Sequence, residues 1–262
     1  MDEVAAHVKD LPMWAAALLA LVENALILVV GVGLGTAVLR LRTVVRLLPD
    51  PGRIDPLQGW LAASAVLLNT AVTVVGWKLW TLGVIRFDLD VSWRIAVDLL
   101  LLVLAMDFAS YVGHALAHVR WLYPLGHRLH HRFVDARPIT LFALHPGEVI
   151  GFGALWLVML SIVPLSVWAL VGYTVINLVF GIFGHLGVEP LPLRWRPSRP
   201  FAIVATPTMH AMHHLNPARN LGFYTTIWDR LFRTLDDDYD RCRRNGHSPL
   251  PSPPPLATPA TP

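Results

Sequence analysis

Residues 149–183 read VIGFGALWLVMLSIVPLSVWALVGYTVINLVFGIF, an apolar stretch with no charged side chain. One continuous helix of this length would extend roughly 50 Å at about 1.5 Å per residue, whereas the hydrocarbon core of a bilayer is about 30 Å thick. Pro164 lies near the centre of the stretch, where it interrupts helical hydrogen bonding. The stretch therefore predicts a helical hairpin that enters and leaves a membrane on the same side.

Three further apolar stretches precede the hairpin, at residues 11–38, 57–85 and 95–113, and each is long enough to cross a bilayer. Of the 262 residues, 55% are hydrophobic and only 15% are charged, whereas an average soluble domain has about 25% charged residues. We therefore expect an all-α, multi-pass integral membrane protein with three crossings and the hairpin. Acidic residues flank the first stretch and no small-residue cleavage site follows it, so we interpret it as an anchor rather than a signal peptide.

Arginine is distributed unevenly among the segments that connect these stretches. Three connections are rich in it, with Arg40, Arg42, Arg46 and Arg53 in the first, Arg120, Arg128, Arg132 and Arg137 after the third stretch, and Arg194, Arg196 and Arg199 after the hairpin. Because short cytoplasmic loops carry an excess of Lys and Arg, this pattern predicts an external N-terminus and a cytoplasmic, histidine-rich helical cap, in a bacterial inner membrane or the ER. The totals of 21 Lys+Arg and 18 Asp+Glu are nearly balanced, so we expect the bilayer and no nucleic acid as a partner.

Histidine is the second unusual feature, because all but two of the 12 histidines lie between positions 114 and 214. Three clusters contain His114 and His118; His127, His130 and His131; and His210, His213 and His214. Residues three or four apart share one side of a helix, so each cluster directs its imidazoles into one sector. Three such sectors facing one another would enclose two metal ions. The single cysteine excludes a Cys-based metal site, and neutral imidazoles suit zinc, copper, iron and nickel.

One acidic and one aromatic residue are predicted to lie on the same helix face as the first histidine cluster. Asp107 and Tyr111 precede His114 and His118 at helical spacing, and an acidic residue next to a membrane is costly unless it is used. We interpret Asp107 as an outer carboxylate that accepts an imidazole N–H and fixes its tautomer. The alternative, that the histidines are merely interfacial, does not account for three clusters on one topological side. The absence of HExxH argues against a zincin protease.

Over residues 105–236 the chain resembles the fatty acid hydroxylase superfamily, membrane-bound diiron enzymes that include sterol desaturases and lipid hydroxylases. The motifs that carry the resemblance are the three histidine clusters, Asp107-Phe108, His145-Pro146 with Glu148, Phe183-Gly184-His185, Thr206-Pro207-Thr208-Met209-His210, and Trp228-Asp229-Arg230-Leu231-Phe232 with Thr234. We therefore divide the chain into an N-terminal transmembrane region (1–104), a histidine-box domain (105–236) that includes the hairpin, and a Pro-rich tail (241–262) that we expect to be disordered.

The resemblance implies a dimetal ligand set of His114, His118, His127, His130, His131, His185, His210, His213 and His214. It leaves His145 as a ligand or as outer support together with Glu148. It also implies two Fe ions, which zinc could replace in a purified sample, O2 as co-substrate, a lipid substrate, and electrons from a separate cytochrome b5- or ferredoxin-like protein with its reductase. Three positions depart from the family pattern: Glu189 stands where some members have a further histidine, Leu221 where tyrosine is frequent, and Arg233 where glycine is usual. At the first of these, one ligand is either missing or replaced by the Glu189 carboxylate.

The predicted activity is O2-dependent hydroxylation, or desaturation, of an unactivated C–H bond in a lipid such as a sterol or fatty acyl chain. Two alternatives stay open: a non-catalytic metal-binding or metal-transport membrane protein, and a zinc hydrolase that acts on lipid. A transporter would place polar residues along a path through the membrane, whereas these histidines gather at one end.

Overall fold

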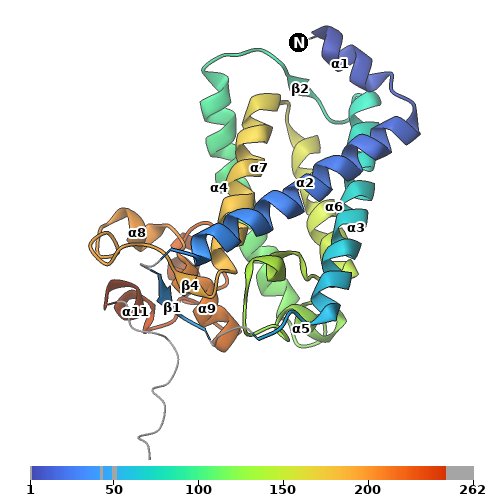
Figure 1. The fold of residues 1–262 in the computed structure, drawn as a ribbon. Coiled ribbons are helices and arrows are strands. Elements are labelled where there is room, and N and C mark those ends of the chain that lie inside the picture. The colour runs from blue at the N-terminus through green and yellow to red at the C-terminus, as the bar shows by residue number, and fades with distance from the viewer. Residues whose placement is uncertain (1, 42–43, 49–51, 246–262) are drawn as a thin grey trace, which may run out of the picture.

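The structure of the protein, a computed structural model, describes residues 2–41, 44–48 and 52–245. A bundle of long helices forms its body (Figure 1). These helices are α2 (Met13–Leu39), α3 (Pro56–Thr81), α4 (Arg94–Ala117), α6 (Pro146–Ile162) and α7 (Val167–Gly184). The short helix α1 (Asp2–Lys9) lies at one end of the bundle, where the Trp77 indole donates a hydrogen bond to the Val8 carbonyl.

Four helices of the described part of the chain, α2, α3, α4 and α7, are long and apolar enough to cross a membrane, and α6 is a shorter apolar helix. Their outer faces expose large apolar side chains, among them Leu26, Val75 and Leu100 at 56%, 49% and 59%. Such exposure is costly in water and favourable in lipid. The all-α, multi-pass membrane fold predicted from the composition is therefore confirmed.

The predicted hairpin is also confirmed. Helix α6 ends at Ile162 and α7 begins at Val167, so Pro164 lies in the turn between them. The turn contains β3 (Leu165–Ser166), which pairs in parallel with β2 (Phe87–Asp88) from the α3–α4 connection. Within it, the Ser166 N–H donates to the Asp98 carboxylate at 2.8 Å. The hairpin thus runs the length of the bundle and turns at the end opposite its two termini.

Helix α2 crosses the bundle diagonally and packs on α3 and α7 (Figure 1). The contact with α7 is close at Gly35, where an added Cβ would lie 3.0 Å from Cγ2 of Ile182, and small residues of this kind allow membrane helices to approach. Between α2 and α3, the Asn24 amide donates to the Thr73 hydroxyl at 3.3 Å. Such interhelical bonds add modestly to stability in lipid.

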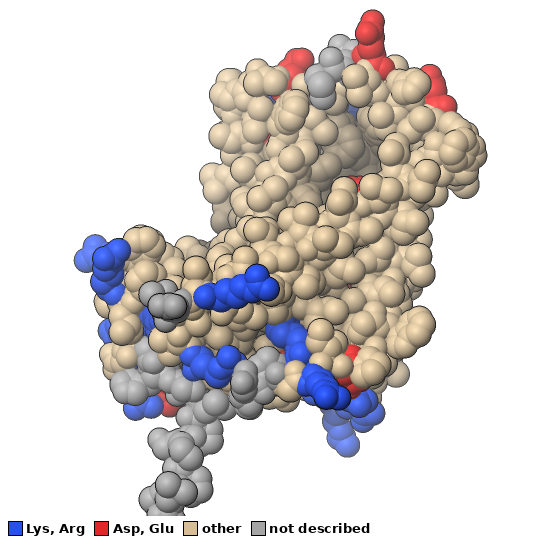
Figure 2. Space-filling model, viewed as in Figure 1, with Lys and Arg blue, Asp and Glu red and all other residues tan. Residues whose placement is uncertain are grey.

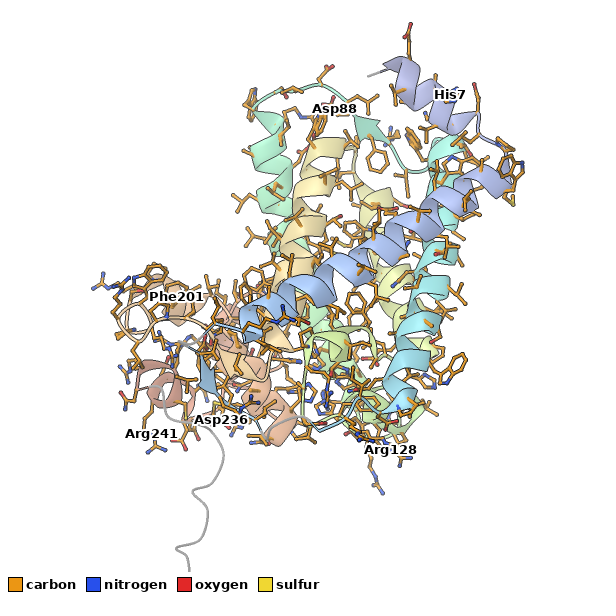
Figure 3. The ribbon with its side chains drawn as sticks, in the orientation of Figure 1. His7, Asp88, Arg128, Phe201, Asp236 and Arg241 are labelled. Atoms are coloured by element: carbon orange, nitrogen blue, oxygen red, sulfur yellow. The ribbon has the colours of Figure 1, made fainter. Side chains whose placement is uncertain are left out.

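The two ends of the bundle carry different charges. In the view of Figure 2, acidic side chains stand at the end that bears α1, whereas arginine side chains gather at the other end and along the side near α8. His7 and Asp88 lie at the first end, and Arg128 and Arg241 lie at the second (Figure 3). The arginine-rich connections therefore share one end, as the sequence predicts.

Short elements form a cap at the arginine-rich end; two of the histidine clusters lie in this cap, and the first lies at the end of α4 beside it. The short helices of the cap are η1 (Tyr123–Leu125), α5 (His127–His130), η2 (Pro138–Phe142), α8 (Pro200–Ile203), α9 (Pro207–Leu215), α10 (Ile227–Phe232) and α11 (Tyr239–Asn245). A two-residue ladder joins β1 (Val45–Arg46) to β4 (Val188–Glu189) in antiparallel register, with Val45 opposite Glu189.

The prediction that the disordered tail begins at residue 241 is wrong. Residues 241–245 belong to α11, because Tyr239 and Cys242 are buried against Met209 and Met212 of α9. The remaining part of that prediction, residues 246–262, lies outside the described residues.

Candidate metal centre

The histidines that the resemblance implies as ligands lie together in two groups. The five-histidine group contains His114, His118, His127, His131 and His213, and the four-histidine group contains His130, His185, His210 and His214. Within each group the ligand nitrogens lie within 4.8 Å of one another. Helix α4 and its C-cap supply His114 and His118, and the C-cap of α7 supplies His185.

Each HxxHH cluster is divided between the two groups. In α5 and its C-cap, the i,i+4 pair His127 and His131 enters the five-histidine group, while His130 enters the other. In α9 the division is reversed, because the i,i+4 pair His210 and His214 enters the four-histidine group and His213 the five-histidine group. The two short helices thereby bridge the groups and make them one centre.

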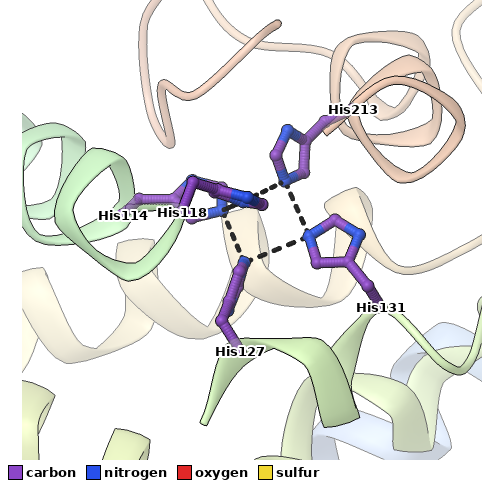
Figure 4. Close-up of side chains that lie close together, drawn as sticks. All are labelled: His114, His118, His127, His131 and His213. Carbon is purple, nitrogen blue, oxygen red and sulfur yellow. Dashed lines mark hydrogen bonds between the residues drawn. The ribbon is translucent and has the colours of Figure 1, made fainter. Parts of the chain in front are cut away.

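The Nε2 atoms of the five-histidine group form a closed ring (Figure 4). Going round it, His114 lies 3.0 Å from His127, His127 lies 3.1 Å from His131, His131 lies 3.1 Å from His213, His213 lies 3.2 Å from His118, and His118 lies 3.3 Å from His114. In the four-histidine group, the corresponding distances are 3.2 Å for His130–His185, 3.1 Å for His185–His210 and 3.1 Å for His210–His214.

Hydrogen bonding cannot account for the ring. The Nδ1 atoms of His114 and His213 each lie 2.8 Å from a backbone carbonyl, that of Leu221 and Arg219 respectively. Because a carbonyl only accepts, both Nδ1 atoms carry the proton, and in a neutral imidazole Nε2 is then a lone pair. The His127 Nδ1 likewise faces the Glu148 carboxylate at 2.6 Å. The Nε2 atoms of His114 and His127, 3.0 Å apart, are thus two acceptors that need a cation between them.

The spacing fits a metal ion. Zinc–imidazole bonds are about 2.0–2.1 Å long, and two nitrogens bound at a right angle to one ion are then separated by about 3 Å. The neighbouring Nε2 distances of 3.0–3.3 Å match this separation. Imidazole is a ligand for iron, zinc, copper and nickel alike.

The cap keeps these imidazoles neutral. Burial, together with the charge that His114 would carry, lowers the pKa of His118 to about 3 and that of His131 to about 4, and burial lowers the pKa of His185 to about 4. The pKa values of His130, His210 and His214 are also well below the usual range, first because of burial and then because of the adjacent imidazoles. A neutral imidazole is the form that ligates a metal.

Outer contacts orient several rings. Besides the carbonyls of Leu221 and Arg219, the Gly181 carbonyl accepts from Nδ1 of His185 at 2.7 Å. The second oxygen of Glu148 is buried and has no hydrogen-bond partner among the residues that the structure describes. Carbonyls and carboxylates in this position fix the tautomer of a ligand and typically affect metal affinity by 10–100-fold.

The loop that supplies the Leu221 carbonyl is held by the closing signature of the sequence. The Asp229 carboxylate accepts from the backbone N–H groups of Leu221 and Gly222 at 2.8 and 2.7 Å, and from the Thr234 hydroxyl at 2.6 Å. Tyr111 in turn donates to the Thr234 hydroxyl at 3.0 Å. Two of the departures from the family pattern are explained here. Leu221 supports His114 through its backbone carbonyl, which any residue type presents, and Arg233 adopts φ 59°, where glycine is favoured.

The other predicted site residues lie outside the two groups. The Asp107 carboxylate does not face an imidazole; it accepts from the backbone N–H groups of Tyr224 and Thr225 and from the Trp228 indole. The Glu189 carboxylate accepts from the backbone and hydroxyl of Thr208, at the start of α9, rather than lying among the imidazoles. His145 caps α6, because its Nδ1 accepts from the Gly147 N–H at 3.1 Å.

Sequence reasoning missed Tyr123, which covers the five-histidine group. Its ring stacks on His118 with centroids 5.4 Å apart, and it lies 5.9 Å from the ring of His131. A tyrosine nine residues after His114 shares no helical face with the cluster, and Pro124 follows it, so no periodicity marks it.

An apolar pocket of about 400 Å³ adjoins the four-histidine group. We call it the side pocket; it lies between the C-terminal end of α2, α7 and the segment 190–206. Only His185 and His210 of the two groups are among its lining residues. Its volume falls within the roughly 300–1,000 Å³ of small-molecule sites.

The fold and the site together define a multi-pass membrane protein whose end cap holds two histidine groups suited to metal ions. The family model "Fatty acid hydroxylase" matches residues 99–234, just over half of the chain. The chain belongs to the fatty acid hydroxylase family.

Among curated proteins, the chain is 28% identical over 146 residues to a cholesterol 25-hydroxylase-like protein of Danio rerio, which covers 54% of this chain and 57% of the relative. It is 24% identical over 183 residues to the very-long-chain aldehyde decarbonylase GL1-8 of Oryza sativa subsp. indica, covering 68% of this chain and 67% of the relative. The chain spans about half the length of the first two curated relatives it matches, 57% and 49%. No solved structure matches it significantly.

Proposed function

We propose that the protein is a membrane-bound oxidoreductase that uses two iron ions and O2 to hydroxylate an unactivated C–H bond of a lipid. The observation that carries the proposal is the pair of converging, neutral histidine groups, one of which adjoins an apolar pocket. The five-histidine group would hold one ion and the four-histidine group the other. Bound iron supplies the reduction of O2, a chemistry that side chains alone do not perform.

The chain's own residues position the ions and exclude water. Backbone carbonyls of Leu221, Arg219 and Gly181 hold the imidazoles in the tautomer that presents Nε2. Side chains that line the side pocket, such as Phe180 and Phe223, give the lipid chain a dry path to His185 and His210. Hydroxylation takes one oxygen atom of O2 into the product and reduces the other to water, which requires two electrons and two protons from outside the chain.

We propose that a separate acidic electron-transfer protein, ferredoxin- or cytochrome b5-like, supplies these electrons at the face that bears Tyr123. Arg120, Trp121, Leu125 and Arg128 are exposed around it. The ring of Tyr123 contacts His118, which makes this face the short route to the five-histidine group. Positive charge of this kind steers and orients an acidic partner.

We further propose that this end of the bundle faces the cytoplasm, of a bacterial inner membrane or of the ER. The support is the gathering of arginine at this end (Figure 2), because short cytoplasmic loops carry an excess of Lys and Arg.

Two neighbouring functions are weighed against this one. Desaturation by the same centre would remove two hydrogens and leave no oxygen in the product; hydroxylation is favoured because the first relative is named as hydroxylase-like. Metal transport is disfavoured because the histidines lie at one end of the bundle. Between α2 and α3, the contact of Asn24 with Thr73 is one hydrogen bond and does not form a series of metal ligands across the membrane.

The test is the fate of isotopic oxygen. Membranes containing the protein are incubated with ¹⁸O2, an electron source and the lipid extract of the host, and the lipids are compared with those from the His130→Ala variant. An alcohol carrying ¹⁸O that appears only with the unaltered protein supports the proposal. An alkene without oxygen, or identical lipids in both samples while iron is bound, contradicts it.

A further inference from the structure

The side pocket is open on the side of the molecule rather than at the end that carries the cap. Leu41, just beyond the end of α2, and Trp195 line it and are 52% and 50% exposed. Its other lining residues include Val179 of α7, Phe201 of α8 and Ala205. Because α2 and α7 are membrane-spanning by length and composition, an opening between α2 and the segment 190–206 lies where the bilayer meets the cap.

The segment 190–206 is built as a fixed rim rather than a loose loop. Arg196 is 1% exposed and its guanidinium donates to the carbonyls of Leu191 and Glu189. Further along, the Ala205 N–H donates to the Tyr224 carbonyl at 2.9 Å and the Thr226 hydroxyl donates to the Ala202 carbonyl at 2.9 Å. The rim is therefore tied to the loop that also supports the histidines.

Exposed arginines are frequent in the two segments that form the opening. Arg40, Arg194 and Arg199 are exposed beside the lining residues, and the Arg194 guanidinium lies 5.5 Å from the centroid of the Trp195 ring. The sequence from Pro190 to Thr206 contains no Asp or Glu. An apolar pocket with an arginine rim is complementary to a molecule with an apolar chain and a negatively charged head group.

We propose that the side pocket binds the acyl chain of one anionic amphiphile, which enters from the bilayer between α2 and the segment 190–206. Its carboxylate or phosphate lies at Arg40, Arg194 and Arg199, and its chain extends toward His185 and His210. The two histidine groups are thereby unequal: the four-histidine group faces the lipid, and the five-histidine group faces the side covered by Tyr123. The assignment of the pocket to the reacting lipid rests on the proposed function, but binding itself does not.

The experiment uses the full chain as purified, without O2 or an electron donor, so that no oxidation is needed for the readout. The probes are octadecanoic acid bearing a diazirine in its chain, the methyl ester of the same acid, and a diazirine-bearing cholesterol. After irradiation the labelled peptides are identified by mass spectrometry. We expect the acid to label residues of the pocket lining, and unlabelled octadecanoate to compete with it.

Two matched variants test the location. Val179→Phe adds a ring inside the pocket, whereas Val175→Phe makes the same change one turn earlier in α7, at an exposed position outside the lining. We expect labelling by the acid to fall about tenfold in the first variant, because the added ring occupies the volume that the acyl chain needs, and to be unchanged in the second. Equal labelling in both variants, or adducts outside the lining, overturns the proposal. Ala205→Leu, which fills the pocket from the rim, is the second variant if Val179→Phe does not fold.

The charge is tested by the double variant Arg194→Gln, Arg199→Gln. Labelling by the acid should fall about tenfold, as expected for the loss of hydrogen bonds to a charged group, and labelling by the ester should change little. Cholesterol that labels the pocket as strongly as the acid overturns the choice of an anionic amphiphile. If the acid labels the pocket lining but no ¹⁸O product forms, the proposed function is refuted and the lipid-binding proposal is retained. If the ¹⁸O product forms but the lining is not labelled, the lipid-binding proposal is refuted and the proposed function is retained.

Discussion

Oε1 of Glu148 lies 2.6 Å from Nδ1 of His127, so the first turn of α6 orients an imidazole that α5 supplies. This contact couples the hairpin to the five-histidine group. Glu148→Ala should weaken iron binding by this group by about 10–100-fold, the usual effect of losing such a support. Glu148→Gln should bind more tightly than Glu148→Ala, because its amide oxygen still accepts the His127 N–H. Iron retained against a graded chelator measures both.

The control for this prediction is Asp90→Ala, which removes an exposed carboxylate at the opposite end. Thermal unfolding of the metal-free variants separates lost affinity from lost folding. Iron held by Glu148→Ala as tightly as by the unaltered protein would show that the hydrogen bond does not support a ligand.

Asp229 should matter for both stability and metal binding, although it touches no histidine. Its carboxylate is fully buried and accepts from Leu221, Gly222 and Thr234. In Asp229→Ala these donors lose their partner, and each buried unsatisfied group costs about 1–3 kcal/mol. We expect a clearly lower melting temperature together with weaker iron binding, since Leu221 then no longer holds His114 in place. Asp238→Ala, at an exposed carboxylate, should change neither quantity.

Much of the architecture could be predicted from the sequence because membrane spans depend on local composition. The hairpin followed from an uncharged stretch with Pro164 at its centre, and the histidine clusters followed from helical spacing. What could not be predicted was the division of each HxxHH cluster between two groups, since spacing places His127, His130 and His131 on one sector without saying what faces them. That division depends on where α4, α7 and α9 meet.

The misplaced role of Asp107 has a similar cause. Its stripe with His114 and His118 is real, but the loop around Tyr224 and Thr225 comes from more than a hundred residues later and takes up its carboxylate. Local periodicity carries no information about such a partner. Backbone carbonyls such as those of Arg219 and Leu221 are invisible to sequence reasoning for the same reason, because any residue type presents one.

Arg233 and Asn220 adopt the same left-handed backbone, with φ of 59° and 57°, but glycine should affect them in opposite directions. Left-handed backbone costs an ordinary L-residue about 1–2 kcal/mol, so Arg233→Gly should stabilise the protein by up to about 1 kcal/mol after the entropy of glycine is counted. The Arg233 contact that supports Arg219 is made by its carbonyl and is retained.

Asn220→Gly should destabilise instead, because its side chain donates to the Met209 carbonyl and accepts from the Asp236 N–H. Two lost hydrogen bonds at about 1 kcal/mol each outweigh the backbone gain. Chemical or thermal unfolding of the two variants, side by side, measures the difference. A lower melting temperature for Arg233→Gly would mean that its side chain contributes a contact that outweighs the strain.

The proposed orientation predicts which end of the bundle an impermeant thiol reagent reaches. In a Cys242→Ser background, Asp90→Cys and Arg128→Cys place one exposed thiol at each end. In sealed cells or spheroplasts we expect labelling at position 90 and protection at position 128, with both labelled after the membrane is opened. Labelling of position 128 in sealed cells would place the histidine cap outside the cytoplasm, and the topology would then have to be inverted.

The two histidine groups share no residue, so they should lose metal independently. His130→Ala removes a ligand of the four-histidine group, and His213→Ala removes one of the five-histidine group. The variants are reconstituted with Fe(II) and washed with a chelator. We expect the unaltered protein to retain two irons per chain, each single variant about one, and the double variant almost none. The reason is that each substitution removes one Nε2 ligand from its own group, where the neighbouring Nε2 atoms are spaced to bind one ion.

His145→Ala is the matched control, because His145 is a histidine of the same region of the sequence, between His131 and His185, but caps α6 through its Nδ1. It should retain both irons. Zinc is assayed in the same samples, since imidazole groups take either metal. If the single variants keep two irons, the histidines do not form two separate sites. If His130→Ala loses both, the ion of the five-histidine group depends on a ligand shared across the centre, and the division of the HxxHH clusters between two ions would be wrong.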